Sequence, residues 1–210
     1  MVRIWGRRAA LNVQKVLWCA DEAGIAYTQI DAGQHHGVVN EPRYRALNPN
    51  GRIPTIEDGA LVLWESNAIV RYLCARYAMG TLCPKDLGAR ADADRWMDWQ
   101  ATTLFQPTFR TYYLTITRTP TAEQDQAQLA GLHRNLVEMF SLLNAHLAGQ
   151  AFVGGDTFTM GDIPVGTVID KWMRIPVARP PMTQLEAYYQ RLNARSAYRT
   201  HVSGFAYDAI

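Results

Sequence analysis

Two short segments of the sequence combine residue types that could hold a small peptide-like molecule. The first reads N-P-N-G-R-I-P over residues 48–54, and the second reads W-E-S-N-A-I over residues 64–69. Pro54 begins a strand-like run, where proline is tolerated only at an edge or a turn. A cis Ile53-Pro54 bond would turn the N–H and C=O of Ile53 outward without partners. Such an edge can pair with a short peptide by β-augmentation.

The second segment adds charge recognition to this edge. Ser66 opens a helical run, and the free N–H groups at a helix start form a ready carboxylate site. Glu65 beside it offers a counter-charge for an ammonium group. Taken singly, the residues can be explained as a helix cap, an exposed glutamate and a turn proline. The ordered set favours a site for a zwitterionic amino-acid head group and an adjacent peptide bond.

The sequence lacks the common motifs of nucleotide-binding, metal-dependent and serine-nucleophile sites. It contains no GxGxxG, GxxxxGK[ST], HExxH or GxSxG pattern. The adjacent His35 and His36 lie in a glycine-rich stretch and are interpreted as solvated loop residues. Cys19, Cys74 and Cys83 are odd in number and lack CxxC spacing, which argues against a disulfide scaffold and a zinc site. We expect no metal, buried thiols at Cys19 and Cys74, and an exposed thiol at Cys83.

Composition excludes several classes of protein. The chain has 210 residues, 48% of them hydrophobic and 19% charged, with a formal net charge of +2. This is ordinary globular composition, and no basic run is long enough to indicate a nucleic-acid partner. The longest apolar runs are five residues, 16–20 and 60–64, too short to span a membrane. With no secretory leader in its first residues, the sequence predicts a soluble, cytoplasmic protein.

The first eighty residues alternate between strand and helix patterns. A turn signal at Asp58-Gly59 separates the last two strands, so they are expected to form a hairpin. The expected order is βαβαββα, with strands at 2–5, 26–30, 53–56 and 60–64 and helices from residue 11, at 41–47 and at 66–77. A hairpin at the end of a βαβ unit indicates a mixed sheet. Residues 1–80 are therefore expected to form an α+β domain.

Beyond a linker at residues 79–88, every pattern is helical. One apolar stripe runs from Leu129 to Leu147 and ends near Gly149. Thr159 and Asp162 have the spacing of a capping box, with Thr159 as the N-cap, and a last helix is expected at 183–193. Residues 88–210 are thus expected to form an all-α domain. Its early aromatic residues could build a substrate pocket, although packing explains most of them better: Trp96, Trp99, Phe105, Phe109, Tyr112 and Tyr113.

With these features, the sequence resembles the cytosolic glutathione transferases over its whole length. The resemblance implies a thioredoxin-like first domain that binds glutathione as co-substrate, with no metal. It implies that Ile53, before a cis Pro54, pairs with the cysteinyl backbone of glutathione and that Arg52 lies near the peptide. Glu65 and Ser66 would hold the γ-glutamyl group. The second domain would supply a hydrophobic substrate wall, and a homodimer is expected.

The residues near the thiol depart from the common pattern of this family. The position of the activating serine or threonine falls on Ala10, with Ala9 before it, and neither side chain can donate a hydrogen bond. Asn12 remains as the candidate catalytic residue, since its amide N–H at a helix start could stabilise a thiolate. This resembles bacterial, serine/asparagine-type, theta- or nu-like members, some of which reduce disulfides. At a position that is often glutamine or histidine in the family, this sequence has Val39.

Two functions follow as hypotheses. The first is a glutathione transferase whose bound thiolate attacks hydrophobic electrophiles, small disulfides or peroxides, as in detoxification. The second is a glutathione-binding or protein-interaction module with little catalytic activity, which Ala9 and Ala10 favour. The complete set of Asn12, Glu65 and Ser66 argues for the enzyme.

Overall fold

The computed structural model describes residues 1–205 as two compact units. Unit 1 contains Met1–Asp86 together with the described residues from Arg195 onward, and unit 2 is Leu87–Ala194. The sequence prediction assigns the residues after Arg195 to the helical domain instead. Among the described residues, no helix is long and apolar enough to cross a membrane.

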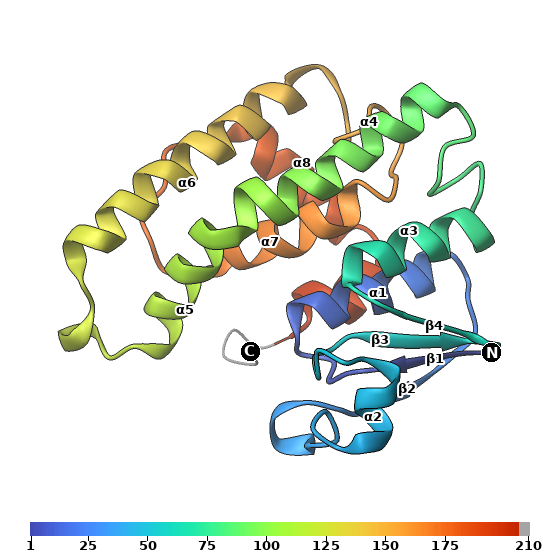
Figure 1. Ribbon diagram of the computed structural model, residues 1–210. Coiled ribbons are helices and arrows are strands. Elements are labelled where there is room, and N and C mark those ends of the chain that lie inside the picture. Colours follow the sequence, from blue (N-terminus) through green and yellow to red (C-terminus); the bar gives the residue numbers. More distant parts are fainter. Residues whose placement is uncertain (206–210) are drawn as a thin grey trace. The chain divides into compact units, whose positions relative to one another are not determined.

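Unit 1 is a four-stranded sheet with helices on both faces. In Figure 1, α1 and α3 lie on one face of the sheet and α2 lies on the other. Its elements are β1 (Val2–Trp5), α1 (Leu11–Glu22), β2 (Tyr27–Ile30), η1 (Gln34–His36), α2 (Pro42–Leu47), β3 (Thr55–Asp58), β4 (Leu61–Trp64), α3 (Ser66–Tyr77), α9 (Ser196–Tyr198) and η5 (Arg199–Ser203). The predicted βαβαββα order is confirmed.

The sheet is mixed, as the hairpin pattern predicts. Its strand order is β2-β1-β3-β4, with β1 parallel to β2 and antiparallel to β3, and β3 antiparallel to β4. Strand β3 begins at Thr55, two residues later than expected, because Pro54 has no N–H to give to the ladder. Ile53 and Pro54 therefore lie just before the strand, and the bond between them is cis.

Helix α1 is buried on nearly all sides. Between Leu11 and Ala20, every residue is buried except Asn12, which is half-buried. The C-terminal segment covers this helix: Arg195 makes two hydrogen bonds of 2.8 and 2.6 Å to the Glu22 carboxylate. The ring of Trp18 meets that of Tyr198 edge-on at 4.7 Å. Burial of the helix on several faces encloses even its polar residues Gln14 and Lys15.

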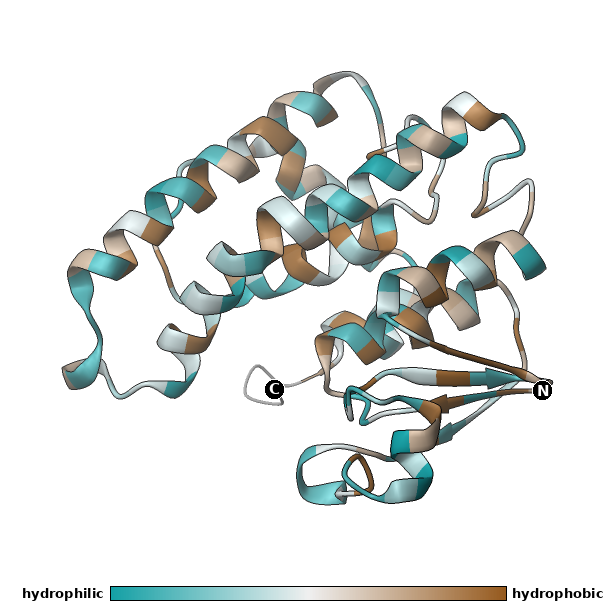
Figure 2. Ribbon diagram, viewed as in Figure 1, coloured by the Kyte–Doolittle hydropathy of each residue, from teal (hydrophilic) through white to brown (hydrophobic). Residues whose placement is uncertain are grey.

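Unit 2 is entirely helical over its described length. Its elements are α4 (Leu87–Asp98), η2 (Trp99–Phe109), α5 (Arg110–Arg118), η3 (Thr121–Glu123), α6 (Gln126–His146), η4 (Leu147–Gly149), α7 (Asp162–Arg174) and α8 (Thr183–Asn193). Hydrophobic and hydrophilic residues alternate in bands along α4 and α6 (Figure 2), as expected of helices with one buried face. The predicted stripe lies on α6, where Leu129, Leu136, Phe140 and Leu143 are buried.

The packing of unit 2 is centred on α7. Gly161 lies so close to α4 that a β-carbon there would be 2.6 Å from the carbonyl oxygen of Ala93, so a larger residue would separate the two helices. The rings of Phe140 and Trp172 stack at 4.6 Å between α6 and α7. Such aromatic contacts add to the free energy gained by burying the rings.

Asp162 ties the start of α7 to the segments before it. The helix begins at Asp162 with Gly161 as N-cap, so the predicted N-cap at Thr159 is wrong. The reciprocal bond of a capping box is nevertheless present, because the Asp162 carboxylate accepts the backbone N–H of Thr159 at 2.8 Å. It also accepts the N–H of Val153 at 2.9 Å and the hydroxyl of Tyr188 at 2.7 Å. Burial raises the pKa of Asp162 to about 6, although these hydrogen bonds act in the opposite direction.

The raised pKa makes stability depend on pH. Between about pH 4 and pH 6, folded Asp162 holds a proton that the unfolded chain has released, so the free energy of unfolding falls as pH rises through this window. The expected fall from this group is on the order of 3 kcal/mol. Urea unfolding of the wild type and Asp162→Asn at several pH values measures it. The difference between the two proteins must shrink by this amount from pH 4 to pH 7; a constant difference contradicts the assignment.

Candidate functional site

A small cleft of unit 1 brings together the residues that the sequence singles out. It has a volume of about 80 Å³. The residues that line it come from the start of α1, the segment before β3 and the junction of β4 with α3: Asn12, Asn48, Asn50, Arg52, Ile53, Pro54, Glu65 and Ser66. All six predicted site residues are in this set. Asn48 and Asn50 belong to the same N-P-N-G-R-I-P motif, but no role was predicted for them because neither residue type indicates a contact by itself.

The backbone of Ile53 is open on one side of this cleft. Within residues 1–205, its N–H and C=O groups form no hydrogen bond. The side chain of Ile53 packs against the cluster of Trp5, Ala32 and Tyr44, which fixes the segment from below. Val39 packs against the same cluster, so it has an apolar contact where a polar residue is usual in the resembling family. The free backbone edge is suited to pair with an extended peptide.

Two side chains under the segment hold it in shape. The hydroxyl of Tyr44 donates to the carbonyl oxygen of Arg52 at 2.7 Å and lies 2.9 Å from the Oγ1 of Thr55. The amide of Asn48 donates to the same carbonyl at 2.8 Å and to Thr55 at 3.1 Å. Burial raises the pKa of Tyr44, which keeps its hydroxyl protonated and able to donate. The carbonyl of Arg52 is thereby satisfied from inside, and the Ile53 edge alone is left for a ligand.

The opposite wall of the cleft is the start of α3. Glu65 is the N-cap residue and has a φ of +70°, which is unusual for a residue other than glycine. This backbone conformation leads from β4 directly into the helix, while the Glu65 side chain stays exposed. Ser66 is the first helical residue and is buried. A carboxylate beside the free N–H groups of a twelve-residue helix provides a negative and a positive partner next to each other.

The start of α1 supplies one polar side chain to the cleft. Ala10 is the N-cap of this helix and provides no side-chain hydrogen bond there. Neither Ala9 nor Ala10 lines the cleft, whereas Asn12 does. The amide of Asn12 is thus the side-chain donor that α1 offers, next to the helix N-terminus.

The cysteines lie away from this cleft. Cys19 and Cys74 are buried as predicted, with their sulfur atoms 3.5 Å apart between α1 and α3. The hydrogen bond to Cys74 and burial raise the pKa of Cys19 well above its usual range, so it is no thiolate nucleophile. The prediction of an exposed Cys83 is wrong, because the residue is fully buried and its backbone is hydrogen-bonded into the turn after α3. Among residues 1–205, no cluster of His, Cys, Asp and Glu could hold a metal ion, and His35 and His36 are exposed.

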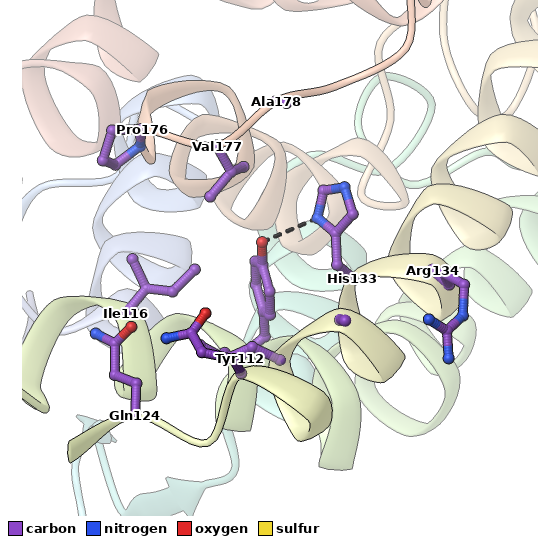
Figure 3. Close-up of a pocket in the computed structure, with 11 residues that line it drawn as sticks. Tyr112, Ile116, Gln124, His133, Arg134, Pro176, Val177 and Ala178 are labelled. Atoms are coloured by element: carbon purple, nitrogen blue, oxygen red, sulfur yellow. Dashed lines mark hydrogen bonds between the residues drawn. The ribbon is translucent and has the colours of Figure 1, made fainter. Parts of the chain in front are cut away.

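Unit 2 contains a larger cavity of about 550 Å³ (Figure 3). At its floor, the hydroxyl of Tyr112 lies 2.9 Å from the Nδ1 of His133. Burial and the charge of Arg179 lower the pKa of His133, which favours its neutral form. Its walls are formed by Tyr112, Ile116, Gln124, Gln126, Leu129, Ala130, His133, Arg134, Pro176, Val177 and Ala178.

Most of the predicted aromatic residues serve packing rather than this cavity. Of the six aromatic residues considered from the sequence, Tyr112 lines the cavity. Phe109 and Tyr113 stack on each other at 5.7 Å, and Trp96 meets Trp99 edge-on at 5.1 Å. The interpretation of most of them as packing residues therefore agrees with their contacts.

Comparison with known proteins gives one consistent result. Residues 11–76 match the family model "Glutathione S-transferase, N-terminal domain", and residues 126–194 match "Glutathione S-transferase, C-terminal domain". The chain is 38% identical over 201 residues to glutathione S-transferase GstB of Escherichia coli K12, covering 95% of this chain and 96% of that protein. It is 30% identical to glutathione S-transferase F11 of Arabidopsis thaliana, over 78% of each chain.

A solved structure is also similar along the whole chain. It is the theta class glutathione S-transferase of the citrus canker pathogen Xanthomonas axonopodis pv. citri with glutathione bound. The TM-score is 0.91 with 48% sequence identity, and 98% of each chain is covered.

The network under the cleft can be tested by removing Asn48. Because Asn48 is buried and its amide bonds Arg52, Thr55 and Asn50, Asn48→Ala should lower the free energy of unfolding by about 2–3 kcal/mol. The matched control is Asn40→Ala, which removes an exposed asparagine just before α2 together with its one solvent-exposed hydrogen bond from Arg45 and should cost about 0.5 kcal/mol. Urea unfolding measures both. Equal losses for the two variants contradict the assigned role of Asn48.

Proposed function

Because the chain belongs to the glutathione S-transferase family, we propose that its cleft binds glutathione and that Asn12 stabilises the bound thiolate for attack on a second substrate. The single observation that carries this proposal is the cleft itself, in which an unpaired Ile53 backbone faces the Glu65–Ser66 helix start. Glutathione is the co-substrate, and the glutathione-bound Xanthomonas relative supports its binding.

The parts of glutathione match the walls of the cleft. The γ-glutamyl end carries an ammonium for Glu65 and a carboxylate for Ser66 and the free N–H groups at the start of α3. The cysteinyl backbone pairs with the open N–H and C=O of Ile53 as one more extended strand. The side chain of Arg52, at the exposed rim, provides a cation near the peptide. Pro54 ends the edge and keeps a second N–H out of the cleft.

The chemical step needs a thiolate, and two features of α1 favour it. The free N–H groups of the helix start carry a partial positive charge, and the Asn12 amide adds a hydrogen bond to the sulfur. The thiol proton passes to solvent. The sulfur then forms a bond to an electrophilic carbon as a leaving group departs, or to one sulfur of a disulfide as the other leaves as a thiolate. An amide donor stabilises the charge that develops in the transition state of an addition to an aryl halide less well than a hydroxyl does. We therefore expect disulfides and peroxides to react better than aryl halides.

The remaining parts of the proposal concern assembly and location. The family resemblance adds a homodimer in the cytoplasm, with a hydrophobic electrophile or a disulfide as second substrate. Size-exclusion chromatography with light scattering tests the dimer, and a mass close to 23.6 kDa would contradict it. The alternative, a binding module with little activity, is favoured if immobilised glutathione retains the protein but no aryl halide, peroxide or small disulfide is turned over.

The γ-glutamyl assignment predicts a difference between two neighbouring substitutions. Glu65→Ala removes the partner of the ligand ammonium and should weaken glutathione binding by about 1.5–3 kcal/mol. Ser66→Ala should weaken it only modestly, because the backbone N–H groups of α3 remain. Titration calorimetry measures both affinities, with melting temperatures as a control for folding. Unchanged affinity in Glu65→Ala would refute this orientation of the ligand.

The role of Asn12 predicts a change in the thiol rather than in binding. Asn12→Ala should raise the pKa of the bound thiol by about 1–2 pKa units and lower kcat, with affinity nearly intact. The ultraviolet thiolate absorbance of the complex against pH gives the pKa. Ala10→Ser, which restores a hydroxyl near the usual position, is the matched comparison. If Asn12→Ala changes neither quantity while Ala10→Ser strongly raises aryl-halide turnover, Asn12 has no role at the sulfur.

A further inference from the structure

We propose that Lys15 is a positioning residue for glutathione, a buried amine on α1 that takes up a proton when the γ-glutamyl carboxylate binds at the start of α3. This inference rests on the proposed function and places a buried cation behind the start of α3, in addition to Arg52 at the rim of the cleft. The observations behind it all lie within unit 1.

Lys15 connects the two walls of the cleft. It follows Asn12 by three positions, so both side chains lie on the same face of α1. The Lys15 Nζ donates to the Oδ1 of Asn67 at 3.2 Å. Asn67 directly follows Ser66 in the first turn of α3, the turn that is proposed to hold the ligand carboxylate. Lys15 therefore bonds the helix end that is proposed to hold the ligand.

The amine is buried, which is rare for lysine. The residue is 3% exposed, and the whole sequence contains two other lysines, Lys85 and Lys171. Lys85 is exposed, and the buried Lys171 is paired with Asp170 at 3.2 Å. Burial lowers the pKa of Lys15 to about 7, with the nearby charge of Glu65 acting in the opposite direction. Near neutral pH, Lys15 is thus divided between its charged and neutral forms.

Other charged groups around α1 act elsewhere on the helix. From the C-terminal segment, Arg195 contacts Glu22, and His201 contacts Asp21 at 2.6 Å. These pairs lie at the far end of α1, more than a turn from Lys15. Near the start of α3, the charged group that acts on Lys15 is Glu65, which directly precedes Ser66.

Helix α3 itself carries two arginines. Arg76 in its last turn contacts Asp58 at 3.5 Å, and Arg71 stands one turn after Asn67. From the sheet, the Glu57 carboxylate is bound by the side chains of Arg3 and Trp5. These charges are already present in the free protein, so a ligand that binds at the cleft adds its own charge to a fixed background.

The sign of the coupling follows from the charge of the ligand. Lys15 is already fully shielded from water, so a bound molecule changes its surroundings mainly through charge. Glutathione with an intact thiol carries two carboxylates and one ammonium, a net charge of −1. The carboxylate at the α3 start adds negative charge next to Asn67, the hydrogen-bond partner of Lys15, and raises the pKa of Lys15. The ligand ammonium at Glu65 acts in the opposite direction, but Glu65 is exposed and water screens its charge, so the carboxylate has the larger effect. Binding then draws a proton from solvent, and affinity decreases as pH rises above about 7.

The experiment uses S-methylglutathione, whose sulfur cannot ionise, so thiol deprotonation does not contribute. Titration calorimetry at pH 7.5 in two buffers of different ionisation enthalpy counts the protons exchanged on binding. For a pKa rise of about one unit, we expect an uptake of about half a proton. Between pH 6.5 and pH 8.5, the affinity should fall by up to about tenfold.

Lys15→Met keeps the length of the side chain and removes the charge. It should remove this half proton from the measured uptake, so that any uptake and pH dependence that remain come from the amino group of the ligand. Lys85→Met, which removes an exposed lysine of the same unit, should behave as wild type. Wild-type uptake that persists in Lys15→Met, or proton release in place of uptake, overturns the inference.

A second measurement does not need the variant to fold. With lysine labelled at its ε-carbon, the wild-type protein has a signal for each of three lysines. Burial lowers the pKa of Lys171 as well, so the Lys15 signal is recognised as the one that titrates near pH 7 and moves to higher pH when S-methylglutathione is added. If no signal titrates below pH 9, the inference is wrong. If S-methylglutathione does not bind at all, the proposed function fails first; binding without any lysine response refutes only the role of Lys15.

Discussion

The burial of helix α1 is the constraint on which the first unit depends. Sheet, α3 and the C-terminal segment enclose this helix, so its position is fixed by packing from several sides. Asn12 is left half-buried at its first turn, and Lys15 meets Asn67 across the gap to α3. A helix held this firmly can present its N-terminus and one amide at a defined place. Preorganised polar groups of this kind bind and stabilise charge without having to reorganise first.

The peptide edge of the cleft depends on a different set of forces. Ile53 can offer a free backbone because Tyr44 and Asn48 satisfy the neighbouring carbonyl of Arg52 from inside. An unpaired backbone is costly when it is buried, so it persists where water or a ligand can reach it. Glu65 carries a second cost, a positive φ at the junction of β4 and α3. Unfavourable local geometry at a cleft is typical of functional sites, where surrounding structure maintains it.

The helical unit has its own buried polar centre. The Asp162 carboxylate accepts hydrogen bonds from the preceding segment and from α8, and these bonds fix the start of α7 against its neighbours. The cavity beside Tyr112 and His133 lies in the same unit and shares no residue with the cleft of unit 1. Packing in this unit thus rests on a hydrogen-bonded carboxylate surrounded by aromatic and aliphatic side chains.

The sequence by itself determined the order of elements and the mixed sheet, since alternation and turn residues are local signals. Its two short motifs, together with the family resemblance, indicated six of the eight residues that line the cleft. Only the tertiary structure decided what those signals do not encode. The N-cap of α7 is Gly161 rather than the predicted Thr159, because the Asp162 carboxylate also accepts hydrogen bonds from Val153 and Tyr188. The burial of Cys83 and of Lys15 could not be read from the sequence, because contacts between distant segments determine which side chains are shielded from water. Burial in turn shifts the pKa of Lys15.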